Sequence, residues 1–233
     1  MKKTRQSLLL ILCVLVVGTG VAGVVPKVNA SEPTKQQLLV DQARITFQSM
    51  ITEHGMTWLR DNLYQAKGVL IIPRLLKGGF IFGGSGGRGV LLVKNPDTGK
   101  WSQPAFYSLG GGSFGLQIGI ESAEVIMMVR TQKGVDKLLT SSFKLGGDIS
   151  LTTGPVGQGV RSNVTADIYS FSRSQGLFGG IAIDGAVLAT RDAWNEAYYG
   201  RPVTPADILI LNLVNNPGST ELRNAVSNVA VIK

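Results

Sequence analysis

The chain has 233 residues, among them 30 glycines, one cysteine and one histidine, and its formal net charge is +8 at pH 7. A single cysteine excludes a disulfide within the chain and a cysteine-ligated zinc site, and a single histidine excludes an HExxH zinc site. The length fits one domain that buries about 70% of the surface its unfolded chain exposes.

The first 30 residues have the pattern of a bacterial signal peptide. Three basic residues lie among the first five, an uncharged apolar run follows at residues 8–17, and residues 28–30 read Val-Asn-Ala. Compact side chains at the −3 and −1 positions suit signal peptidase, so we expect cleavage after Ala30 and export to the periplasm or cell envelope. The alternative is an uncleaved N-terminal anchor, because residues 8–25 are just long enough to span a bilayer.

The expected mature chain is a single domain at residues 31–233, and it has no cysteine because Cys13 leaves with the signal peptide. The leader also carries four basic residues and no acidic ones, so its removal halves the net charge. The modest remaining charge, the export and the scarcity of clustered aromatic residues argue against nucleic acid as a partner.

Residues 36–66 have the spacing of one or two helices. Leu39, Ala43, Phe47 and Met50 recur three or four residues apart, which is typical of the apolar face of a helix. Gly55 is expected to break or bend this segment.

A glycine-rich region follows, and 24 of the 30 glycines lie between residues 68 and 185. Helices do not tolerate that density, whereas strands with bends and bulges do. The expected fold is α+β and mostly β: a curled or barrel-like antiparallel sheet with an N-terminal helix and short C-terminal helices. We expect strands near 68–73, 79–94, 100–109, 113–129, 143–153, 164–174 and 177–190, and helices near 131–139, 191–199, 205–214 and 220–232.

Two glycine motifs and two serine motifs resemble catalytic signatures, but their surroundings argue against catalysis. Residues 84–89 and 110–115 match GxGxxG, and Ser85 and Ser113 each lie in a GxSxG motif. A phosphate-binding loop needs a helix directly after the glycines, whereas strand-like residues follow both. A serine hydrolase of this kind needs a histidine after the nucleophile, and His54 precedes both serines. We therefore expect no enzyme activity, no cofactor and no metal site, with a hydrolase kept only as an alternative.

Several segments, in this order and spacing, resemble the SYLF lipid-binding domain, which is also known as an actin-regulator domain from its fungal members. The resemblance covers about residues 36–214, and one departure is Phe171, where the pattern often has Tyr. The segments are residues 66–73, 77–80, 84–91, 101–104, 112–119, 154–157, 169–174, 176–180 and 198–200, with Gly185 and Asn195.

The resemblance implies a non-enzymatic module that binds membrane lipids. Eukaryotic members bind phosphoinositides and some bind actin filaments. For an exported protein, we expect the general property to carry over: binding to an anionic phospholipid surface through the N-terminal part of the domain. The alternative is a protein-interaction or scaffold module with a partner in the cell envelope, in which lipid binding is incidental.

The charge pattern agrees with an anionic partner in this part of the chain. Between residues 60 and 100 there are seven basic residues and two acidic ones. Arg74-Leu75-Leu76-Lys77 follows Pro73 and is expected to be a loop in which two leucines lie between two cations. The alternative is that these leucines pack in the core. The candidate lipid-binding residues are Lys67, Arg74, Leu75, Leu76, Lys77 and Arg88.

Overall fold

The computed structural model describes residues 32–79, 82–114, 119–157, 165–174, 177–179 and 183–231. The chain divides into two units, Met1–Glu32 and Pro33–Lys233, and the second contains the helices and strands reported below. The expected signal peptide, the alternative anchor and Cys13 lie outside the described residues and stay predictions. In the described part, no helix is both long enough and apolar enough to cross a bilayer.

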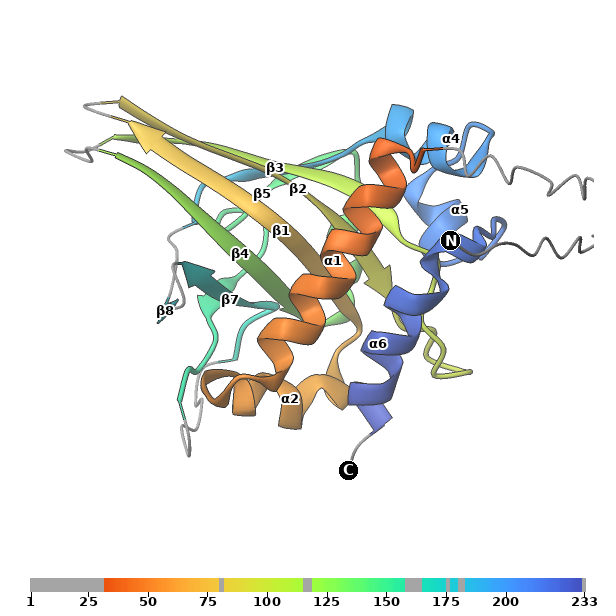
Figure 1. The fold of residues 1–233 in the computed structure, drawn as a ribbon, viewed down its shortest axis with the longest axis horizontal. Helices are drawn as coiled ribbons and strands as arrows, with labels where there is room; N and C mark the ends of the chain where they lie inside the picture. Colours follow the sequence, from red (N-terminus) through yellow and green to blue (C-terminus); the bar gives the residue numbers. More distant parts are fainter. Residues whose placement is uncertain are drawn as a thin grey trace, which may run out of the picture. The chain divides into compact units, whose positions relative to one another are not determined.

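One curled sheet forms the centre of the second unit (Figure 1). Its order is β5-β9-β3-β2-β1-β4-β7-β6, with β8 paired to β7. Neighbouring strands are antiparallel except β6 and β7, which are parallel. The strands are β1 (Gly68–Gly79), β2 (Phe82–Val93), β3 (Ala105–Phe114), β4 (Gly119–Val129), β5 (Ser142–Lys144), β6 (Leu151–Thr153), β7 (Ile168–Ser174), β8 (Leu177–Gly179) and β9 (Val187–Thr190).

Helices pack on both faces of the sheet. The long helix α1 crosses β1 and β2 and lies beside α6 (Figure 1). It starts where the Thr34 hydroxyl accepts a hydrogen bond from the Gln37 backbone N–H, an N-cap. The helices are α1 (Lys35–Thr52), η1 (His54–Met56), α2 (Thr57–Asn62), η2 (Leu63–Gln65), α3 (Gln132–Leu138), α4 (Asp192–Tyr199), α5 (Pro205–Leu209), η3 (Pro217–Ser219) and α6 (Thr220–Val231).

The part of the sheet next to Lys67 is buried on both faces, so the strands there, such as residues 69–72 of β1 and 90–93 of β2, read as continuous apolar runs. Along β1, Val69 and Ile71 join the core under α1, α2 and α6. Leu70 and Ile72 join a second core on the opposite face, which α3 and α5 cover. Successive strand residues point to opposite faces, so a run without polar interruption fills two cores at once.

Strand β1 continues past Pro73 to Gly79, and this corrects the expected loop at residues 74–77. Pro73 has no N–H to donate, so within a sheet it requires a bulge or an edge. The pairing register of β1 with β2 shifts between Ile71 and Arg74, and that with β4 shifts between Ile72 and Leu75. A β-bulge therefore accommodates the proline, and the strand resumes after it.

The α+β class and the curled sheet are confirmed, and helices contribute as large a share of the described residues as strands do. The expected strand at residues 143–153 is two short strands, β5 and β6, which pair with different partners. The expected helix at 205–214 ends at Leu209.

Candidate functional site

Two of the predicted site residues, Arg74 and Arg88, lie directly opposite each other on β1 and β2. Ser108 on β3 is paired with Arg88 and continues the same row across the sheet. With Leu76, Arg191 and Trp194, these residues line a cleft of about 520 Å³. We call it the arginine cleft. It opens on the α1 side of the sheet, because Leu39 and Gln42 of α1 also line it.

The arginine cleft concentrates positive charge. The guanidinium carbon of Arg88 lies 5.2 Å from the centre of the Trp194 ring, and that of Arg191 lies 4.7 Å from it. Burial lowers the pKa of Arg191 and the charge of Arg88 lowers it further, although a guanidinium stays protonated in proteins. The described residues that line the cleft include no carboxylate. Three guanidinium groups in a cleft whose described lining has no carboxylate favour the binding of an anion.

One donor in the arginine cleft has no acceptor. The Arg191 Nε atom is buried and makes no hydrogen bond to a described residue. The backbone of Arg191 is held in place, because its N–H donates to the Phe106 carbonyl oxygen at 2.9 Å. A buried donor without a partner costs free energy.

Beyond the cleft, the same face of the sheet has few side chains. Gly86 is paired with Gly110, and Gly84 with Gly112. We call these four glycines the bare face. They belong to β2 and β3, which extend with β1 and β4 beyond helix α1 (Figure 1). A Cβ atom added at Gly86 or Gly112 would meet nothing within 4 Å, so packing inside this chain does not require glycine there.

Two exposed apolar side chains lie at the edge of the bare face. Leu76 on β1 is 39% exposed and Ile120 on β4 is 84% exposed. Leu76 is paired with Ser122 and Gly78 with Ile120, so the two side chains lie diagonally on the same face of neighbouring strands. The arginine cleft therefore has exposed apolar groups beside its cations.

The structure separates the other predicted site residues from this cleft. Leu75, expected at the surface, is fully buried in the second core, which corrects its role as an exposed membrane contact. Lys77 points to the same side as Leu75 and is paired with Glu121 on β4. Lys67 precedes β1, seven residues before Arg74, or roughly 20 Å along the strand.

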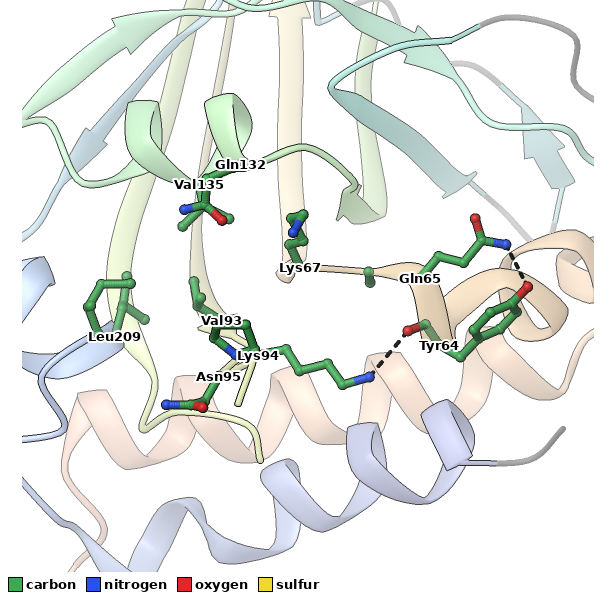
Figure 2. Close-up of a pocket in the computed structure, with 12 residues that line it drawn as sticks. Tyr64, Gln65, Lys67, Val93, Lys94, Asn95, Gln132, Val135 and Leu209 are labelled. Carbon is green, nitrogen blue, oxygen red and sulfur yellow. Dashed lines mark hydrogen bonds between the residues drawn. The ribbon is translucent and has the colours of Figure 1, made fainter. Parts of the chain in front are cut away.

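Lys67 lines a second cavity, of about 400 Å³, at the opposite end of β1. We call it the lysine pocket. Figure 2 shows Lys67 between Val135 on one side and Val93 on the other, with Lys94 nearby. The predicted site thus divides into two places, each with its own cations.

The glycine and serine motifs are located within the sheet. Residues 84–89 lie inside β2, and the next described element is a strand rather than a helix. The Ser85 hydroxyl donates to the Gly111 carbonyl oxygen at 3.5 Å, a long contact, and His54 lies in η1. The side chain of Ser113 and residues 115–118 lie outside the described residues. The described ranges contain no group of three side chains suited to holding a metal ion.

Two residues of the arginine cleft, Arg191 and Trp194, were not predicted. They are more than 100 positions from Arg88 in the sequence and become its neighbours only through the pairing of β9 with β3. In the sequence they stand out only because an arginine and a tryptophan lie at the start of the short helix α4, and this is a weak indication of a site.

The chain resembles proteins with known names. A family model described as "Las17-binding protein actin regulator" matches residues 110–229, slightly more than half of the chain. LAS seventeen-binding protein 3 of Saccharomyces cerevisiae is 33% identical over 156 residues, which cover 64% of this chain and 34% of that protein. SH3 domain-containing YSC84-like protein 1 of Homo sapiens is 31% identical over 150 residues, which cover 62% of this chain and 43% of that protein. The match therefore spans less than half of the length of these relatives.

Proposed function

Because the chain belongs to the Las17-binding protein actin regulator family, the family indicated by its SYLF-type motifs, we propose that it is a non-enzymatic interaction module. Its arginine cleft and bare face bind an acidic surface of a partner protein. The observation that carries this proposal is the convergence of Arg74, Arg88 and Arg191 in a cleft whose described lining has no carboxylate.

The surface has the physical properties that such docking requires. Cations steer an acidic partner and set its orientation, while buried apolar side chains supply most of the binding free energy. Leu76 and Ile120 supply apolar area next to the cations. The bare face allows a partner to approach the backbone closely. The strands β2 and β3 that form this face are already paired with each other in the sheet. The names of the yeast and human relatives, which refer to Las17 binding and to an SH3 domain, support a protein partner as the class.

Photo-crosslinking tests the protein partner. A photoreactive residue at position 86 has room on the open face and should capture one protein reproducibly from the envelope fraction. The variant Arg74→Glu/Arg88→Glu should lose this capture. The control Lys100→Glu/Lys144→Glu makes the same change of charge at two exposed positions away from the cleft and should keep it. Capture that survives the arginine changes would reject the cleft as the docking site.

An anionic phospholipid bilayer is the second candidate partner. The observation in its favour is that exposed Leu76 and Ile120 lie beside Arg74 and Arg88, since interfacial binding combines apolar insertion with attraction to headgroups. Each cation near an anionic membrane contributes about 1 kcal/mol, and each introduced carboxylate repels by a similar amount. Arg74→Glu/Arg88→Glu should therefore weaken vesicle binding on the order of a thousandfold.

Vesicle co-sedimentation distinguishes the two candidates. Binding to anionic vesicles that weakens as salt rises, and that Leu76→Ser reduces without changing the salt dependence, favours the bilayer. Equal recovery on neutral and anionic vesicles would eliminate it. The lipid headgroup is tested in the same assay by comparing phosphatidylglycerol with phosphoinositide vesicles.

The proposal includes export to the periplasm or cell envelope. It rests on the signal-peptide pattern of the first 30 residues. N-terminal sequencing of the protein recovered from the periplasmic fraction should begin at Ser31, and an intact N-terminus in the membrane fraction would favour the anchor.

A further inference from the structure

We propose that the lysine pocket is a second, separate binding site, which takes a small organic anion with an apolar tail, of the class of a medium-chain carboxylate. This site goes beyond the proposed function, because it lies roughly 20 Å from the arginine cleft along β1 and shares no lining residue with it.

The inner wall of the lysine pocket is apolar. Ala66, Val93, Val135 and Leu209 line it, and each is a core residue with almost no exposed surface. They come from four places in the chain: the entry to β1, the end of β2, α3 and α5. Ile210, 42% exposed, lies at the mouth. A cavity of about 400 Å³ lined by apolar residues on one side and by polar and charged residues on the other has the size and character of a small-molecule site.

The charged groups at the mouth are ammonium groups. The backbone of Lys67 is held by two hydrogen bonds, but its ammonium group makes no hydrogen bond or ion pair with a described residue. Lys94 donates one hydrogen bond from Nζ, to the Tyr64 carbonyl oxygen at 3.2 Å, which leaves two of its three N–H groups available. Both lysines line the cavity, and Figure 2 shows the Lys94 side chain reaching toward Tyr64 while Lys67 lies nearer Val135.

The unused hydrogen-bonding capacity of the Asn95 side chain also favours an anion. The Asn95 side-chain oxygen already accepts from the backbone N–H groups of Asp97 and Thr98, both at 2.9 Å, which leaves its amide nitrogen free to donate. The Gln65 amide is fully used, because its oxygen accepts from Arg130 and its nitrogen donates to Asn62 and to the Tyr64 hydroxyl. Asn95 therefore adds a donor beside the two lysines, and a carboxylate accepts several hydrogen bonds.

The nearby carboxylates do not neutralise the lysines. Asp97 is exposed in the turn after β2, and Asp136 accepts a hydrogen bond from Gln132 at 2.9 Å on the outside of α3. Neither lines the cavity. An amphiphile with a negative head near Lys67 and Lys94 and a tail along Val93 and Val135 therefore satisfies both parts of the site.

Isothermal titration calorimetry of the full-length chain with named probes tests the proposal. Butanoate, hexanoate and octanoate should bind with increasing affinity, about fourfold for each added methylene until the cavity is full, because each buried methylene contributes a constant increment. Octan-1-ol and octylamine have the same tail without the negative charge, and both should bind at least tenfold more weakly than octanoate.

Variants locate the site. Lys67→Ala should weaken octanoate binding about tenfold or more, since a charge-assisted hydrogen bond is lost. Lys67→Arg should retain most of it. The control Lys100→Ala removes an exposed lysine outside the pocket and should bind like the unchanged chain. Gln132→Trp, at an exposed position of the mouth, should block the probe while leaving the melting temperature of the free chain unchanged.

Several outcomes would overturn the proposal. Octylamine binding as tightly as octanoate, an affinity independent of tail length, or equal affinity in Lys67→Ala and Lys100→Ala would each do so. Arg74→Glu/Arg88→Glu should leave octanoate binding unchanged. The octanoate assay therefore tests the lysine pocket separately from the arginine cleft, which partner capture tests.

Discussion

Two neighbouring glycines of β2 provide a sharp test of which face of the sheet is packed and which is open. Neither Gly86 nor Gly87 has a positive φ, so alanine is compatible with the backbone at both positions. At Gly87 an added Cβ would lie 2.9 Å from the Arg74 carbonyl oxygen and from the Ile72 Cγ2 atom. At Gly86 it would meet nothing within 4 Å.

The two substitutions should therefore change stability in opposite directions. Overpacking at Gly87→Ala costs about 1–3 kcal/mol, because the Arg74 carbonyl belongs to the paired strand and cannot move away without disturbing the register. Gly86→Ala should be neutral or stabilising by about 0.4–1 kcal/mol, since it restricts the unfolded chain. For a domain of this size, the two melting temperatures should differ by about 3–15 °C.

Thermal unfolding followed by circular dichroism measures the difference, and guanidinium unfolding checks it by a second route. Equal melting temperatures, or a more stable Gly87→Ala variant, would contradict the conclusion that the Gly87 side of β2 is packed and the Gly86 side is open.

Three further predictions concern single side chains. Leu75→Ala should cost about 2–5 kcal/mol because that side chain is fully buried, whereas Leu76→Ala should leave the melting temperature nearly unchanged; scanning calorimetry compares them. Burial raises the pKa of Asp167, but hydrogen bonds from Ser150 and Thr131 outweigh it and lower the pKa, so the ionised carboxylate stabilises the fold at neutral pH. The destabilisation by Asp167→Asn should be full at pH 7 and should shrink as the pH falls below about 4, in melts at a series of pH values. Arg173→Ala removes the guanidinium that lies 2.5 Å from Glu124 and leaves that carboxylate only its hydrogen bond from Thr46, so it should cost about 1–3 kcal/mol in chemical denaturation; an unchanged midpoint would contradict this.

Much of the fold follows from local patterns in the sequence. The spacing of Leu39, Ala43, Phe47 and Met50 predicts α1, and these residues are buried in the first core. The density of glycine between residues 68 and 185 predicts a sheet rather than helices, and the ordered motifs indicate the family. These features are readable because helix and strand periodicity depend on residues only a few positions apart.

The sites depend on contacts between distant residues, which local patterns do not contain. A bulge at Pro73 allows β1 to continue and sets the face of each later residue, so that Leu75 is buried while Leu76 is exposed. A one-residue change of register would exchange those two roles, and sequence spacing alone does not reveal the register. In the same way, only the pairing of β2, β3 and β9 brings Arg191 to Arg88, because strands that are adjacent in the sheet are far apart in the chain. The sequence determined which elements form and which charges are available, and the tertiary structure decided which of those charges meet.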